Sequence, residues 1–114
     1  MKKLFYPESI MVVGVSNTPT NLGKNIVENL ERFHFEGPIY LVGKEDGNLN
    51  GRKISTRIEE IDACPDMAVF LIPAPYIPEA LELCGRKGIH YAVIESGGFS
   101  EFADENKRME RDIL

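Results

Sequence analysis

The residues best suited to chemistry stand in one short stretch near the start of the chain, between Gly14 and Lys24. This stretch separates an apolar, β-branched run from an amphipathic pattern typical of a helix. The first N–H groups of a helix lack partners within it and carry a partial positive charge, which suits a phosphate or pyrophosphate. The candidate ligand-binding residues of this stretch are Gly14, Ser16, Asn17, Thr18, Asn21, Leu22, Gly23 and Lys24.

Several residue types in this stretch favour anion binding. Gly14 allows a tight turn after the strand, and Gly23 allows either the ligand or the sheet to approach the helix closely. The short polar side chains add neutral donors, and Lys24 adds charge in the first turn. The alternative is that Ser16 and Asn21 only cap the helix.

The stretch matches neither of two common phosphate-binding motifs. The dinucleotide fingerprint G-x-G-x-x-G is absent, because the first glycine after Gly14 is Gly23. A P-loop is absent as well, because no G-K-[ST] follows. A Rossmann-type fold stays open on this evidence, without support from a specific motif.

Four apolar runs predict the strands that position this stretch, and continuous apolar runs are typical of strands buried on both faces of a parallel sheet. The runs cover residues 10–15, 39–42, 67–72 and 91–94. Between the second and third runs, we expect a polar loop over 43–51, a short extended piece over 53–55 and a short helix over 57–62.

Helical patterns alternate with these runs. The first helix is expected to end before Gly37-Pro38 and the second, with Pro78 in its first turn, to end between Gly85 and Gly88. A third helix is expected from about residue 101. The buried stripe of the first helix is expected to consist of Leu22, Ile26, Leu30 and Phe33.

This alternation predicts an α/β fold, a Rossmann-like doubly wound parallel sheet with right-handed crossovers and helices on both faces. Ligands bind such sheets beyond the carboxyl ends of the strands. The segments that arrive there are residues 14–24, 42–46, 72–75 and 95–99, all rich in Gly, Pro, Ser or Asn.

Composition excludes several classes of protein. A hydrophobic content of 43% argues against disorder, and a formal net charge of -5 argues against nucleic-acid binding. An apolar run of ~20 residues, as a membrane span needs, is absent, and the run after Met1-Lys2-Lys3 is too short for a signal peptide. We therefore expect a cytoplasmic protein.

The chain offers little catalytic chemistry of its own. Cys64 and Cys84 form no C-x-x-C pair and have no histidine at metal spacing, so we expect two reduced, partly buried thiols and no metal site. Neither a Ser-His-Asp order nor a convincing pair of catalytic carboxylates occurs. His34 and His90 are expected to be structural or surface residues. The isolated chain is thus predicted to bind a ligand, with no catalytic residue.

A series of short segments resembles the CoA-binding domain of ADP-forming acetyl-CoA synthetases and, more distantly, the alpha subunit of succinyl-CoA synthetase. The resemblance covers nearly the whole chain, and its specificity comes from the order and separation of the segments. They are residues 5–10 (FYPESI), 13–16 (VGVS), Pro19, 22–24 (LGK), 37–40 (GPIY), 72–75 (IPAP) and 94–101 (IESGGFSE).

This resemblance implies coenzyme A as the ligand. Ser16, Asn17 and the turn up to Gly23 would hold the CoA phosphates, and Lys44 would be the cation at the adenosine part. Two further segments complete the implied site: Pro73, Ala74 and Pro75 form a wall, and Ser96, Gly97 and Gly98 guide the pantetheine arm. The family shows an Asn-Pro-Lys-like stretch where this chain has Val42-Gly43-Lys44-Glu45-Asp46, so two acids weaken the field around Lys44.

The resemblance also implies a larger parent enzyme. Such enzymes convert acid, CoA and ATP to acyl-CoA, ADP and phosphate, with Mg and a phosphohistidine supplied by parts outside this chain. The final helical pattern stops at Leu114 without a capping glycine, so we expect residues 1–114 to be a truncated N-terminal fragment. The implied partners are the remaining ligase domains or a beta subunit.

Three alternatives remain open at this point. The chain could be a stand-alone CoA- or nucleotide-binding regulator, or the synthetase-like module of a fused protein acetyltransferase. It could also be an NAD(P)-binding Rossmann domain, in which Glu45 or Asp46 meets a ribose, although the fingerprint is missing.

Overall fold

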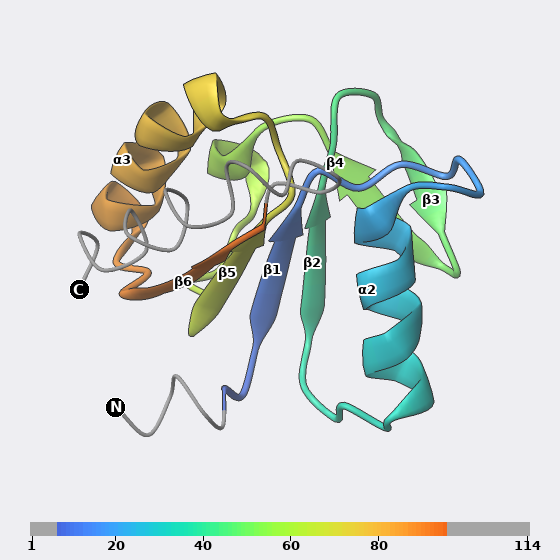
Figure 1. Cartoon of the computed structure of the whole chain (residues 1–114). Helices are drawn as coiled ribbons and strands as arrows, with labels where there is room; N and C mark the ends of the chain where they lie inside the picture. Colours follow the sequence, from blue (N-terminus) through green and yellow to red (C-terminus); the bar gives the residue numbers. More distant parts are fainter. Residues whose placement is uncertain (1–6, 96–114) are drawn as a thin grey trace.

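The computed structural model describes residues 7–95, and these fold around one central sheet (Figure 1). The strand order is β3-β4-β2-β1-β5-β6, and every neighbouring pair is parallel except β3 and β4. The strands are β1 (Ile10–Val13), β2 (Ile39–Val42), β3 (Gly47–Leu49), β4 (Arg52–Ser55), β5 (Met67–Phe70) and β6 (Tyr91–Ile94). The predicted doubly wound α/β fold is confirmed.

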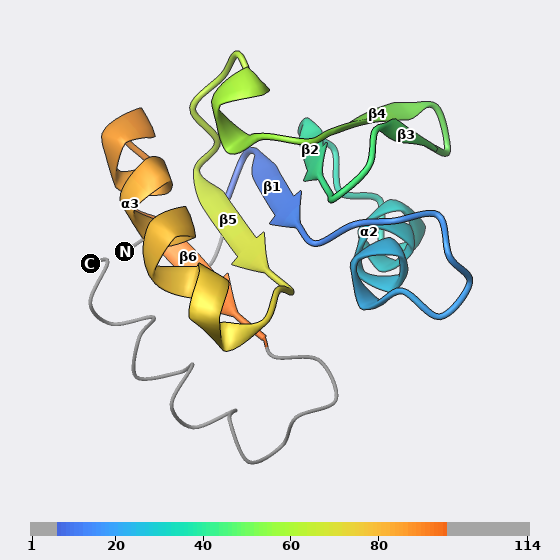
Figure 2. The ribbon, with the colours of Figure 1, turned by 90° about the horizontal axis from the view of Figure 1, so that it is seen from above.

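The two helices of the described part cover opposite faces of the sheet (Figure 2). Alternate residues of β1 point to opposite sides, so Met11 joins the core under α3 (Ile77–Lys87) while Val12 joins the core under α2 (Leu22–Arg32). β1 is buried on both faces of the sheet, and this explains why its sequence is continuously apolar.

Helix α2 presents only part of the predicted stripe to the sheet, because Ile26 and Leu30 pack against the core while the two ends of the stripe do not. Leu22 and Phe33 are 44% and 79% exposed, whereas Gly23 and Val27 are buried. A Cβ at Gly23 would lie 2.7 Å from the carbonyl oxygen of Gly14. The absence of a side chain at Gly23 therefore allows the start of the helix to lie close to the end of β1.

Strand β3 lies inside the segment that was predicted to be only loop, and that prediction was wrong. It pairs antiparallel with β4, and Leu49 is 1% exposed in the core under α2. The connection is Asn50-Gly51, both with positive φ (52° and 85°), a pairing typical of two-residue hairpin turns. This dipeptide was the available signal for the hairpin.

Helix α3 and the cysteines complete the description. Pro78 lies in its first turn, and Gly88 ends it in the left-handed region (φ 89°), within the predicted limits.

Both cysteines are free as predicted, but only Cys84 is buried and Cys64 is exposed. Over residues 7–95, the helices are too short or too polar for a bilayer crossing. The predicted third helix lies outside the described residues.

Candidate functional site

A large cavity opens at the carboxyl edge of the sheet, where ligands of doubly wound folds bind. Its volume is about 1080 Å³, and its walls come from the ends of β1, β2, β4 and β5 and from the start of α3. The predicted site residues that line it are Gly14, Ser16, Asn17, Thr18, Asn21, Lys44 and Pro73. Residues from three separate predicted segments thus meet in one space.

The loop between β1 and α2, residues 14–21, forms one side of the cavity and begins with a sharp turn. The N–H groups of Gly14 and Val15 both donate to the carbonyl oxygen of Val42, at 2.8 and 3.0 Å. Gly14 has φ 108°, and a Cβ there would lie 2.3 Å from the carbonyl oxygen of Leu71. As predicted, glycine permits the tight turn, and here it also permits contact with the end of β5.

The Asn21 side chain joins the two ends of this loop by hydrogen bonds. Its side-chain oxygen accepts from the N–H groups of Lys24 (2.8 Å) and Ser16 (3.0 Å), and its side-chain nitrogen donates to the carbonyl oxygen of Gly14 (3.2 Å). Asn21 is therefore the N-cap of α2, and it also fixes the loop.

Ser16 does not cap the helix. Its hydroxyl lies 2.6 Å from that of Thr18 and accepts from the Thr18 N–H at 3.3 Å. Asn17 donates its side-chain amide to the carbonyl oxygen of Asn48, which ties the loop to β3. The polar side chains of the loop thus hold its shape.

The start of α2 lies beside the cavity wall. Gly23 is buried, and it is the end of β1 that approaches it, with Val15 Cα 3.0 Å from the position of an added Cβ. Leu22 is exposed and Lys24 half-buried, and neither lines the cavity. Asn21 satisfies the N–H of Lys24, while the N–H groups of Leu22 and Gly23 find no acceptor within residues 7–95.

The opposite side of the cavity is charged. We call the set Lys44, Glu45, Asp46, Arg57 and Glu59 the charged rim; all five line the cavity and all are exposed. The first three follow β2 and the other two follow β4. Because β2 and β4 are parallel neighbours, both groups leave the sheet at the same edge.

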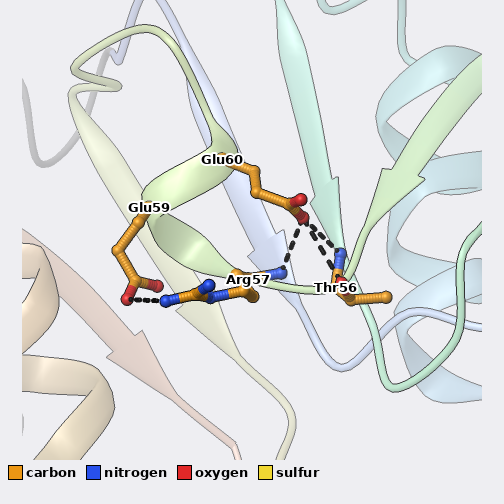
Figure 3. A network of polar contacts seen from close by, with 4 residues as sticks. All are labelled: Thr56, Arg57, Glu59 and Glu60. Atoms are coloured by element: carbon orange, nitrogen blue, oxygen red, sulfur yellow. Dashed lines mark hydrogen bonds and ion pairs between the residues drawn. The ribbon is translucent and has the colours of Figure 1, made fainter.

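Arg57 and Glu59 form part of a polar network that sequence reasoning missed (Figure 3). The Arg57 guanidinium donates to the Glu59 carboxylate at 3.1 Å. The Glu59 pKa lies below its ordinary value, because its own backbone N–H and then the Arg57 side chain donate to the carboxylate. Glu60 accepts from the N–H groups of Thr56 (3.1 Å) and Arg57 (3.2 Å), which fixes the turn after β4.

The segment after β5 contributes only in part. Pro73 lines the cavity, whereas Ala74 and Pro75 belong to the short 3₁₀ turn Ala74–Tyr76 and lie outside its wall. Tyr76, which was not predicted, lines the cavity and is 60% exposed. Ser96, Gly97 and Gly98 lie outside the described residues.

The two histidines lie away from this site. No group of three His, Cys, Asp or Glu residues within residues 7–95 could hold a metal ion. His34 and His90 are exposed, as expected for surface residues, and neither lines the cavity.

Comparison with known proteins agrees with this geometry. A model of the CoA binding domain matches residues 8–111. The chain is 40% identical to acetate–CoA ligase [ADP-forming] II of Archaeoglobus fulgidus, covering 100% of this chain and 17% of that protein. It is 38% identical to the alpha subunit of acetate–CoA ligase [ADP-forming] I of Pyrococcus furiosus, covering 100% of this chain and 26% of that subunit.

Solved structures show the same relationship. The dinucleotide-forming acetyl-coenzyme A synthetase 1 of Ca. Korarchaeum cryptofilum, in its apo form, superposes with a TM-score of 0.81 and 29% identity, over 99% of this chain and 24% of that one. The chain thus spans about a quarter or less of the length of these relatives. It belongs to the family of CoA-binding domains found in ADP-forming acyl-CoA synthetases.

Proposed function

We propose that this chain is the CoA-binding part of an acyl-CoA synthetase that forms a nucleoside diphosphate, and that CoA binds in the cavity at the carboxyl edge of the sheet. The observation that carries the proposal is the meeting of the β1–α2 loop, the charged rim and Pro73 around one space of about 1080 Å³. Ligand pockets commonly measure about 300–1,000 Å³, so this one suits a large ligand.

The β1–α2 loop suits the pyrophosphate of CoA. It leads into the start of α2, where the N–H groups of Leu22 and Gly23 have no acceptor within residues 7–95. The positive end of the helix dipole lies at the same place. The hydrogen bonds of Asn21 fix the backbone before any ligand arrives. A fixed cradle loses little conformational entropy on binding.

The charged rim suits the adenosine end. In doubly wound folds the ribose lies at the tip of the second strand, which is where Lys44 stands. Pro73 would form a wall for the nucleotide or the pantetheine arm, and Tyr76 adds an aromatic surface beside it. Ser96, Gly97 and Gly98 would guide the pantetheine arm.

The role of this chain in such an enzyme is to bind and orient. CoA supplies the thiol that receives the acyl group, and the residues described here hold its nucleotide end. ATP or ADP, Mg and the phosphohistidine would belong to remaining ligase domains or a beta subunit, in a cytoplasmic enzyme with the present chain as its N-terminal part. The length of the relatives supports this view, since they extend far beyond the matched region.

Isothermal titration calorimetry of the 114-residue chain with CoA tests the proposal. We expect one CoA bound per chain, and no binding of NADH, because the dinucleotide fingerprint is missing. Circular dichroism of the same sample confirms that the protein is folded. Folded protein that gives no heat with CoA, or that binds NADH more tightly, contradicts the proposal.

A further inference from the structure

We propose that Arg57 binds the 3′-phosphate of CoA and thereby makes the site select CoA over dephospho-CoA. This inference rests on the proposed function. CoA differs from dephospho-CoA by one phosphate monoester on the ribose, and a cation at the adenosine end would favour the ligand that carries this extra charge. Among the described residues that line the cavity, the cations are Lys44 and Arg57.

The position of β4 brings Arg57 to the adenosine end. Val42 at the end of β2 pairs with Ser55 at the end of β4, and the Gly43 N–H donates to the Ser55 carbonyl oxygen at 2.8 Å. Lys44 and Arg57 are therefore each two residues beyond a paired position, on neighbouring parallel strands. A ribose at the tip of β2 would direct one of its substituents toward β4.

The backbone of Arg57 is held by hydrogen bonds while its side chain is largely exposed. Glu60 accepts hydrogen bonds from the N–H groups of Thr56 and Arg57 and from the Thr56 hydroxyl, which holds the turn at the rim (Figure 3). The Arg57 side chain itself is 67% exposed. The Arg57 backbone thus has a defined position at the rim, and its side chain can reach into the cavity.

Glu59 acts as the counter-ion that a phosphate would replace. Its carboxylate lies 3.1 Å from the Arg57 guanidinium, and the two side chains are 48% and 67% exposed. Exposed ion pairs of this kind contribute little to stability, so exchange for a ligand anion is not costly. Guanidinium and phosphate can form two parallel hydrogen bonds, and a phosphate monoester carries more charge than a carboxylate.

Calorimetry with CoA and with dephospho-CoA, on the wild-type chain and on Arg57→Gln, tests this inference. We expect the wild type to prefer CoA by about tenfold, as for one charge-assisted pair of hydrogen bonds. Arg57→Gln should lose most of that preference and keep the wild-type affinity for dephospho-CoA. Arg57→Lys, which keeps the charge without the planar fork, should retain part of the preference.

Arg86→Gln is the matched control. Arg86 is also exposed (71%) and also paired with a glutamate, Glu82, at 2.7 Å, but it does not line the cavity. It should keep the wild-type preference for CoA. Glu59→Gln tests the exchange itself, because removal of the competing carboxylate should tighten CoA binding more than dephospho-CoA binding.

The outcomes separate this inference from the proposed function. A wild-type chain that binds neither ligand contradicts the proposed function and the inference with it. Binding of CoA with an equal preference in wild type and Arg57→Gln overturns the inference alone. An equal loss of preference in Arg86→Gln would mean that the general field of the protein selects CoA, and this too would overturn the assignment to Arg57.

Discussion

The two sides of the cavity are built in opposite ways. The β1–α2 loop contains no charged side chain, and its shape is held by hydrogen bonds among Ser16, Thr18, Asn21 and the backbone of Gly14. The charged rim consists of exposed ionic side chains, of which Arg57 and Glu59 pair with each other. An acidic protein can thus offer a polyanion fixed backbone dipoles on one side and a few exposed cations on the other.

The largest difference between the two sides should appear when a methyl group is added to the loop. In Gly14→Ala the new Cβ would lie 2.3 Å from the Leu71 carbonyl oxygen, in a residue with φ 108°. Steric overlap and backbone strain together should lower the free energy of unfolding by roughly 3 kcal/mol. Thermal unfolding followed by circular dichroism measures the loss.

Gly85→Ala is the control for this substitution. Gly85 lies in α3 with no atom within 4 Å of an added Cβ, so alanine should raise the free energy of unfolding by about 0.5–1 kcal/mol through helix propensity. Equal stability of Gly14→Ala and wild type would show that the end of β1 can move away from β5, and that the loop is not rigid.

Asn21→Ala should have the next largest effect. It removes the acceptor of the Lys24 and Ser16 N–H groups and the donor to the Gly14 carbonyl oxygen. We expect a loss of about 2 kcal/mol in the free energy of unfolding and weaker binding of CoA, because the loop is no longer held before binding. Urea unfolding and calorimetry measure the two effects.

Asn25→Ala, four residues further along α2 at an exposed position, is the matched control and should leave CoA binding unchanged. If Asn21→Ala lowers stability and leaves the affinity for CoA intact, Asn21 is only a helix cap. That result would support the alternative raised from the sequence, in which this polar residue caps the helix and has no role in ligand binding.

Apolar runs in the sequence predicted β1, β2, β5 and β6. The apolar runs at β2 and β6 match the observed bounds, Ile39–Val42 and Tyr91–Ile94, whereas the runs at β1 and β5 continue two residues past the observed ends, Val13 and Phe70. β3 was missed, since only Leu49 of its three residues is buried and its pairing depends on the Asn50-Gly51 turn. A short polar strand carries too little periodicity to be recognised.

The same distinction applies to the candidate site. The β1–α2 loop was predictable because a turn and a helix start are local features of the sequence. Arg57 was not, because its place in the cavity depends on β4 being the neighbour of β2, and strand order is a long-range property. Ala74 and Pro75 lie in the 3₁₀ turn that follows Pro73, and of the three residues of this turn only Tyr76 lines the cavity.

Lys44→Gln should have a smaller effect than either change in the loop. Lys44 is exposed and stands next to Glu45 and Asp46, so its field is weak and screened by salt. We expect CoA binding to weaken by about threefold at low ionic strength, and the difference to vanish at high salt. Lys53→Gln, an exposed lysine of β4 outside the cavity, should change neither value. A loss greater than that of Asn21→Ala would reverse the comparison between the two sides.

The smallest effect of these substitutions is expected on the reactivity of Cys84. This thiol shows whether a change in the loop or the charged rim disturbs the core under α3. Cys84 is fully buried in α3, next to Leu83, which lines the cavity, and burial raises the pKa of its thiol to about 12. At pH 8, iodoacetamide should modify the exposed Cys64 and leave Cys84 untouched in the wild type, Asn21→Ala and Lys44→Gln alike, as mass spectrometry would show. Above the ordinary thiol pKa of about 8.5, the unfolded chain loses this proton before the folded chain does, so stability should fall as pH rises toward 12. Modification of Cys84 in Asn21→Ala at pH 8 would show that the loop supports the α3 side of the core as well, and that the two sides of the cavity are not independent.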